Sequence, residues 1–305
     1  MTGYRSKELT EAGKRKIVFN PSQGYKDLEV TIACGQCVGC RLERSRQWAI
    51  RCVHEAQMHN ENCFITLTYN PKHLPKDKSL NVEHFKKFMK RFRKRYGKVR
   101  YFHCGEYGEK TKRPHYHACI FGYNFDDLEL VTARTKFPVY TSKKLQQLWS
   151  CPNCKEPIGF VQIGTLTFES AAYVSRYIMK KVTGEKAKEL NEEGLTPYEW
   201  VDKKTGEVFD LKPEYTTMSR RPGIGKDWYD KYKNDVYNYD YVVIRGKKMK
   251  APKYYDRVFE VEFPDEFNKL KGKRKNNIDN QNYEDLEREE KFKKVHLKML
   301  PRTLE

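Results

Sequence analysis

The sequence predicts an α+β fold in which helices flank a central antiparallel sheet. Four short runs are rich in β-prone residues: 64–69, 98–105, 115–122 and 160–164. Two longer segments, residues 41–59 and 82–96, repeat apolar residues at helical spacing. A turn-rich stretch joins the second and third β-prone runs into a hairpin, so these two neighbours are antiparallel.

The composition of the chain indicates a polyanionic partner. Its 305 residues carry a formal net charge of +19 and 13% aromatic residues, which favours nucleic acid over a lipid bilayer. No run of about 18 apolar residues is present, so no transmembrane helix is expected. Residues 1–16 lack an apolar segment, so no signal peptide is expected. The length suits one large domain or two modest ones.

The first predicted elements precede the hairpin. Residues 1–33 are expected to form an extended, poorly ordered arm with one β signal near its end. A loop rich in Cys and Gly, residues 34–40, then opens the first helix. The second helix turns Phe and Met residues toward the core, and its other face carries Lys86, Lys90 and Arg93. That basic face is either solvated or in contact with a DNA backbone.

The hairpin is predicted to have a basic tip at Lys110, Lys112 and Arg113. An insertion follows the hairpin and ends before the strand at residues 160–164. The next helix is expected to begin at Ser170, whose hydroxyl suits the N-cap position.

The C-terminal part has weaker patterns. A charged helix is expected at residues 185–195, a basic loop at 219–225, and short strands at 241–244 and 254–262. Residues from 265 onward are dense in charge, which predicts a solvated helix or disorder. The predicted organisation is an N-terminal arm (1–33), a main domain (34–262) and a charged tail (263–305).

Two histidines of the returning hairpin strand are candidate metal ligands. His115 and His117 are two residues apart, so on a strand they project from the same face and can hold one divalent cation. Glu106, across the hairpin, is the best placed third ligand, and Glu109 is the alternative. A His/His/carboxylate set suits Mg²⁺ or Mn²⁺ bound to a phosphate oxygen. A surface strand with two ordinary histidines is the competing interpretation.

Two tyrosines of the following helix are candidate nucleophiles. Tyr173 and Tyr177 are four residues apart, so both phenols share one helix face, and Lys180 follows within a turn. Such a pair is also typical of an amphipathic core edge. Together with the histidine pair in a basic chain, it indicates attack of a tyrosine on a metal-polarised DNA phosphodiester.

The cysteines allow a separate zinc site. The chain has nine, an odd number, which favours a reducing compartment with free or metal-bound thiols over a disulfide framework. A structural zinc needs four ligands, and Cys34, Cys37, Cys151 and Cys154 are candidates. Isolated thiols are the alternative, because the sequence does not show whether the two segments meet.

Three segments in this order carry a family resemblance: Phe64–Thr68, then His115-Tyr116-His117, then Tyr173–Tyr177 with Lys180. They resemble the motifs of HUH-superfamily rolling-circle replication initiators. The chain is more narrowly similar to the initiators of small single-stranded DNA microviruses of the gokushovirus type, over roughly residues 30–260. The Cys34–Cys40 loop and the 219–223 loop also fit that group.

The resemblance implies an RRM-like palm with helices packed mainly on one face, and a defined chemistry. His115, His117 and Glu106 would hold the metal that polarises the scissile phosphate. Tyr173 or Tyr177 would attack it, form a 5′-phosphotyrosine and release a 3′-OH that primes synthesis. The second tyrosine would act after one round, and reversal would ligate a circle. Lys180 would stabilise the negative charge.

The expected partners follow from the same resemblance. They are single-stranded or origin DNA and, because the chain has no Walker motif, a host helicase together with a host polymerase, in the cytoplasm of the bacterial host cell. No small-molecule cofactor is expected. The candidate DNA-binding residues are Lys86, Lys90, Arg93, Lys112, Arg113, Arg176, Arg220 and Arg221.

Three other functions fit parts of the sequence. A non-catalytic single-stranded DNA-binding protein explains the charge but leaves the histidine and tyrosine pairs without a role. A metal-dependent hydrolase would use activated water and would keep cleaving after loss of both tyrosines. A relaxase- or transposase-type member of the same superfamily would share the chemistry and differ in its substrate.

Overall fold

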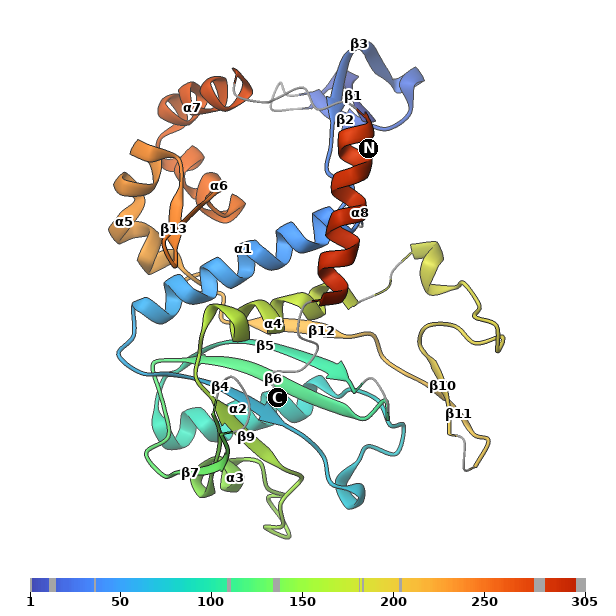
Figure 1. The fold of residues 1–305 in the computed structure, drawn as a ribbon, viewed down its shortest axis with the longest axis vertical. Helices are drawn as coiled ribbons and strands as arrows, with labels where there is room; N and C mark the ends of the chain where they lie inside the picture. The colour runs from blue at the N-terminus through green and yellow to red at the C-terminus, as the bar shows by residue number, and fades with distance from the viewer. Residues whose placement is uncertain are drawn as a thin grey trace.

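The computed structural model describes residues 2–10, 15–35, 37–108, 111–133, 138–180, 182, 184–202, 205–276 and 283–299. Its centre is a seven-stranded sheet with the strand order β12-β5-β6-β4-β9-β8-β7 (Figure 1). The strands are β4 (Asn62–Leu67), β5 (Arg100–Tyr107), β6 (Pro114–Phe121), β7 (Leu128–Thr132), β8 (Val139–Ser142), β9 (Val161–Gly164) and β12 (Tyr215–Met218). Neighbouring strands pair antiparallel, and flanking helices complete the α+β fold that the sequence predicts.

Helices cover both faces of this sheet (Figure 1). One face carries α2 (Val82–Tyr96) and α3 (Lys143–Leu148), and the other carries α1 (Val38–Gln57) and α4 (Phe168–Lys180). The helices predicted at residues 41–59 and 82–96 are thus present. The resemblance implied helices mainly on one face, and the structure differs from that expectation.

Strand β6 shows why two helical layers are needed. Tyr116, Ala118 and Ile120 belong to the core shared with α2, whereas Cys119 and Phe121 belong to the core shared with α1 and α4. Successive side chains of a strand point to opposite faces. Since both sets are apolar, each face must be covered to remove it from water.

Three strands of this sheet were not predicted from the sequence. Strands β7 and β8 form inside the predicted insertion, and β12 pairs with β5 at the other edge. Strand β7 has mostly exposed side chains, which gives it little apolar alternation to recognise. The predicted charged helix at 185–195 is also wrong. A short 3-10 helix (Gly184–Ala187) is followed by a turn in which Asn191 accepts the N–H groups of Glu193 and Leu195.

The N-terminal residues form a small sheet of their own rather than a poorly ordered arm. Its strands are β1 (Thr2–Leu9), β2 (Arg15–Val18) and β3 (Gly24–Thr31), in the order β2-β1-β3. A Cβ atom on Gly24 would lie 2.4 Å from Cβ of Tyr4, so glycine permits the close approach of β3 to β1. Most side chains here are polar and exposed, so the apolar alternation that predicts strands is weak.

The C-terminal third is largely helical. It contains α5 (Lys226–Tyr239), the hairpin of β13 (Val242–Ile244) and β14 (Lys247–Met249), α6 (Lys253–Glu262), α7 (Pro264–Asn276) and α8 (Tyr283–Met299). The strand predicted at 254–262 is wrong, because this segment is helix α6. Tyr255 and Phe259, four residues apart, share one helix face and pack with Tyr229 and Phe267. The domain boundaries at residues 33 and 262 stay predictions.

A remaining small hairpin pairs β10 (Glu199–Val201) with β11 (Val208–Asp210). Among the helices of the described ranges, none combines the length and the apolar character that a membrane span needs.

Candidate metal and tyrosine site

The β5–β6 hairpin brings three potential metal ligands together. Its register pairs Glu106 with His115, and Cys104 with His117, so these side chains project toward α4. Oε1 of Glu106 lies 3.0 Å from Nε2 of His115 and 2.6 Å from Nε2 of His117. One ligand atom from each of the three residues lies within 4.8 Å of the others. The third ligand preferred from the sequence is thus the one at this position, and the alternative, Glu109, lies outside the described residues.

The hydrogen bonds of His115 fit a cation at this point. Its Nδ1 lies 3.0 Å from the carbonyl oxygen of Arg113, and its Nε2 faces the Glu106 carboxylate. Both partners only accept hydrogen bonds, whereas a neutral imidazole has a single N–H to donate. A second proton or a metal cation beside Nε2 is therefore needed to satisfy the ring. The residues present fit a divalent metal.

The electrostatics of Glu106 favour its charged form. Burial raises the pKa of this carboxyl, but the neighbouring His117 and His115 outweigh the burial and lower it to about 2. Only 1% of Glu106 is exposed, so the charge is held in a protein interior where opposite charges interact strongly. The site therefore offers an ionised carboxylate at neutral pH.

Thr66 is a supporting residue that was not singled out from the sequence. Strand β4 pairs with β6 so that Thr66 lies opposite His117, and Oγ1 of Thr66 is 2.9 Å from Nδ1 of His117. This contact fixes the imidazole orientation and leaves Nε2 directed at Glu106. The signal was present, because alternation along β4 places Thr66 and Phe64 on the same face.

Helix α4 carries Tyr173 to the same site. The Tyr173 hydroxyl donates to Oε1 of Glu106 at 3.3 Å, and its ring meets the His117 ring edge to face at 5.2 Å. The guanidinium of Arg176 lies 5.5 Å from the centre of the Tyr173 ring. Tyr177 and Lys180 belong to the same helix, but their side chains lie outside the described residues.

The start of α4 differs slightly from the predicted one. Oγ1 of Thr167 accepts the N–H of Ser170, and Oγ of Ser170 accepts the N–H of Thr167. This reciprocal pattern is a capping box in which Thr167 is the cap and Ser170 lies inside the first turn. The predicted cap was therefore three residues too late.

The candidate DNA-binding residues lie in three places. Lys112 and Arg113 end the hairpin loop beside the site, and a guanidinium nitrogen of Arg113 donates to the carbonyl oxygen of Tyr69 at 2.8 Å. Helix α2, which covers the opposite face of the sheet, carries another set, and an exposed pair follows Ser219 beyond β12. These distant residues are Lys86, Lys90 and Arg93 on α2, and Arg220 and Arg221 after β12. The structure thus groups only Lys112, Arg113 and Arg176 with the site, and Lys110 of the predicted basic tip lies outside the described residues.

The structure does not bring the four candidate zinc thiols together. Cys34 and Cys37 form a group with Cys40 at the start of α1. Cys151 and Cys154 form a different group, and its third member is His73, which was not predicted from the sequence. The two groups are separated because the first precedes α1 and the second follows α3, on opposite faces of the sheet.

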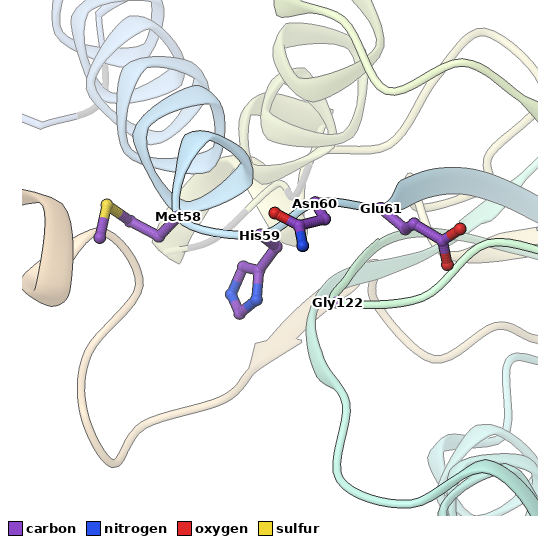
Figure 2. Close-up of a pocket in the computed structure, with 5 residues that line it drawn as sticks. All are labelled: Met58, His59, Asn60, Glu61 and Gly122. Carbon is purple, nitrogen blue, oxygen red and sulfur yellow. The ribbon is translucent and has the colours of Figure 1, made fainter.

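A hollow of ≈ 530 Å³ is separate from the candidate site. Met58, His59, Asn60, Glu61 and Gly122 line it (Figure 2). These residues lie where α1 ends and where the chain leaves β6, at the end of that strand opposite to His115. The hollow therefore does not contribute to the metal and tyrosine site.

Comparison with known proteins identifies the family. The family model for the replication-associated protein ORF2 matches residues 62–182, which contain β4, the hairpin and α4. The replication-associated protein ORF2 of Spiroplasma virus 4 is 34% identical over 252 residues, or 78% of this chain and 70% of that protein. The replication-associated protein VP4 of Bdellovibrio phage phiMH2K is 31% identical over 264 residues, or 82% of this chain and 75% of that protein.

A third relative aligns over less of its length. The replication-associated protein ORF4 of Chlamydia phage 1 is 33% identical over 166 residues, or 51% of this chain and 40% of that protein. No solved structure matches the chain. Since the first two relatives align over most of their own length and most of this chain, the protein belongs to the family of microvirus replication-associated proteins.

Proposed function

We propose that this protein starts rolling-circle replication of a viral genome by nicking origin DNA with a tyrosine. Membership of the replication-associated family supports a role in the initiation of viral replication. The observation that carries the finer proposal is the convergence of Glu106, His115, His117 and Tyr173 on one buried point. A carboxylate, two imidazoles and a phenol in contact form the donor set that this chemistry requires.

The three ligands would hold Mg²⁺ or Mn²⁺. When bound, the cation supplies Lewis acidity to an oxygen of the scissile phosphate. Glu106 provides the negative charge of the site, and Thr66 holds His117 in the orientation that directs Nε2 at Glu106. The Arg113 carbonyl oxygen does the same for His115 through Nδ1.

The nucleophile is a phenol of α4. The hydroxyl oxygen of Tyr173 or Tyr177 would bond to phosphorus, the bond from phosphorus to the 3′-oxygen would break, and the 3′-oxygen would leave as a hydroxyl after taking a proton. The product is a 5′-phosphotyrosine with a free 3′-OH that primes synthesis. Because the phosphodiester is exchanged and not hydrolysed, rejoining needs no ATP. Lys180 is proposed to stabilise negative charge on the phenol or the phosphate.

Basic residues would hold the DNA strand on either side of the reacting phosphate. Lys112, Arg113 and Arg176 are nearest to the ligands and would contact the strand that is cut. The residues that lie farther away would contact flanking DNA, namely Lys86, Lys90, Arg93, Arg220 and Arg221. A host helicase and a host polymerase, in the cytoplasm of the bacterial host cell, would unwind the duplex and extend the 3′-OH.

The test is a denaturing gel of the full chain incubated with labelled single-stranded origin DNA and Mn²⁺. Wild type is compared with Tyr173→Phe, Tyr177→Phe and the double variant, and Tyr116→Phe is the matched control on the opposite face of the sheet. We expect a metal-dependent covalent adduct that the control retains and the double variant lacks.

The other functions predict different gels. DNA binding without any adduct, with or without metal, would support a non-catalytic binding protein. Free cleaved DNA that persists in the double variant would support a hydrolase that uses water. An adduct lost in one single variant would assign one dominant nucleophile and weaken the alternation of two tyrosines.

A further inference from the structure

A second group of metal-ligating side chains lies apart from the proposed nicking site. It joins His73 of the 3-10 helix η2 (Pro71–His73) to Cys151 and Cys154, which follow α3. One ligand atom of each residue lies within 4.8 Å of the others. A long stretch of chain separates the histidine from the cysteines, so the fold and not local sequence creates the group.

The cysteine segment has the backbone of a metal-binding turn. Cys151 and Cys154 enclose Pro152 and Asn153, and the carbonyl oxygen of Cys151 accepts the N–H of Lys155 at 2.9 Å. Lys155 has a φ of 57°, a left-handed conformation that closes the turn after the second cysteine. The N–H groups of Cys154 and Asn153 surround the Cys151 sulfur and lower the pKa of its thiol.

Asn70 prepares the histidine for coordination. Its Oδ1 lies 3.0 Å from Nδ1 of His73 and accepts the N–H of His73 at 2.8 Å. An amide oxygen only accepts hydrogen bonds, so Nδ1 carries the proton of the neutral ring and Nε2 keeps its lone pair for a metal. Asn70 also donates from Nδ2 to the carbonyl oxygen of Pro157 at 2.7 Å, which links it to the cysteine loop.

We propose that His73, Cys151 and Cys154 bind one Zn²⁺ that joins the loop after β4 to the loop after α3. Two thiolates and one neutral imidazole balance the charge of Zn²⁺, and a solvent molecule completes the tetrahedron. Thiolate ligands select Zn²⁺ over Mg²⁺ and Mn²⁺, which prefer oxygen, so the two sites would hold different metals. This inference goes beyond the proposed nicking function and does not depend on it.

The zinc would brace one wall of the nicking site. The loop after β4 contains Tyr69, whose carbonyl oxygen accepts from Arg113, and the Arg113 carbonyl oxygen accepts from His115. The peptide N–H of Asn70, the next residue, donates to the carbonyl oxygen of Ile158 at 2.8 Å. Fixing both loops with a metal removes freedom from the segment that supports Arg113.

The first measurement is zinc content of the full chain, purified under reducing conditions and dialysed against metal-free buffer. We expect one zinc to be lost per chain in Cys151→Ser/Cys154→Ser and to be retained in Cys52→Ser, which removes a buried thiol elsewhere. Because the serine variant could unfold, its secondary structure is compared with wild type by circular dichroism.

The second measurement uses a chain in which the proposed site is intact. Cys34→Ser/Cys37→Ser/Cys40→Ser removes the other thiol group, so Co²⁺ added to it reports on His73, Cys151 and Cys154 alone. We expect one equivalent of Co²⁺ to give the absorption of tetrahedral cobalt thiolate, and Zn²⁺ to displace it. Adding Asn70→Ala should weaken the affinity for Co²⁺ by about 10–100-fold.

Two results would overturn the proposal. One is no thiolate-to-cobalt absorption in the chain that keeps only this site. The other is zinc that stays bound in a folded Cys151→Ser/Cys154→Ser variant. Neither readout uses nicking, so the proposed function can fail while the zinc site stands, and the reverse.

Discussion

The two faces of the central sheet use the same strands for different purposes. Toward α4, β6 presents His115 and His117 to a buried carboxylate and a tyrosine. Toward α2, the residue between them, Tyr116, is fully buried among aromatic side chains and donates to the carbonyl oxygen of Asn81. Alternation along one strand thus separates chemistry from the stabilising core, so substitutions at adjacent positions should have unrelated effects.

The histidines of the two faces make the same point. His117 contacts Glu106 and Thr66, whereas His103, on β5, is fully buried with its ring stacked on Phe85 at 3.4 Å and its Nδ1 on the Thr217 hydroxyl. Burial among aromatic rings makes His103 a core residue. A histidine is a ligand candidate because of the groups that it faces, and its presence in the sheet alone does not decide this.

The sharpest test of the comparison changes neighbouring residues on opposite faces. Glu106→Gln removes the charge that the cation needs, so we expect nicking to fall by about 10³-fold, the loss of several kcal/mol of charge stabilisation. Tyr116→Phe should destabilise the fold by about 1–3 kcal/mol and leave the nicking rate unchanged. Single-turnover nicking and urea unfolding measure the two effects. Equal loss of nicking in both variants would contradict the division.

A smaller effect is expected from the residue that orients His117. Thr66→Val keeps the shape of the side chain and removes the hydroxyl at 2.9 Å from Nδ1. Loss of such a supporting hydrogen bond lowers metal affinity or activity by about 10–100-fold. The Mn²⁺ concentration that gives half-maximal nicking should rise, and excess Mn²⁺ should restore part of the rate. An unchanged Mn²⁺ dependence would rule out the orienting role.

The histidine of the core should reveal itself through pH. Burial lowers the pKa of His103 well below its ordinary value of 6.5. The unfolded chain therefore takes up a proton below that pH while the folded protein does not, and stability falls as the pH drops below 6.5 by up to about 1.4 kcal/mol per pH unit. His103→Phe should flatten the fall seen by urea unfolding at several pH values. His54, whose pKa burial lowers to about 3, keeps the rest of the slope.

The smallest effect concerns basic residues on the two faces. Lys112→Gln, beside the site, should reduce the salt dependence of binding to a short oligonucleotide across the nick by about one unit of slope. Lys86→Gln/Lys90→Gln, on α2, should not change binding to that oligonucleotide. Lys86 is also paired with Glu83 at 2.6 Å, which offsets its charge. Fluorescence anisotropy over a range of salt concentrations separates the two, and an equal loss would place DNA on both faces.

The sequence predicted best what depends on neighbouring residues. The hairpin and its turn lie within one stretch of chain, so alternation alone placed His115, His117 and Glu106 on one face. The helices at α1 and α2 show long amphipathic patterns and were recognised for the same reason. Tyr173 was recognised from its motif, and its contact with Glu106 follows from helix packing that the sequence does not display.

What the sequence did not predict depends on distant segments. Edge strand β12 pairs with a strand that lies far earlier in the chain, and its few residues alone have little pattern. His73 joins Cys151 and Cys154 only after α3 and the loop following β4 pack together. Helix α6 was taken for a strand because its aromatic residues are β-prone, yet their spacing matches helical packing against α5 and α7.

The segment after β12 also sets the order in which this protein is completed during synthesis. Arg100 and Glu55 form a buried ion pair, Arg100 donates to the carbonyl oxygen of Pro222, and Glu55 accepts the N–H of Gly225. A nascent chain that has not yet reached Gly225 has β5 and α1 without these two partners. The strand that carries Glu106 therefore gains its last edge late in translation, and closure of such long loops is a slow step of folding.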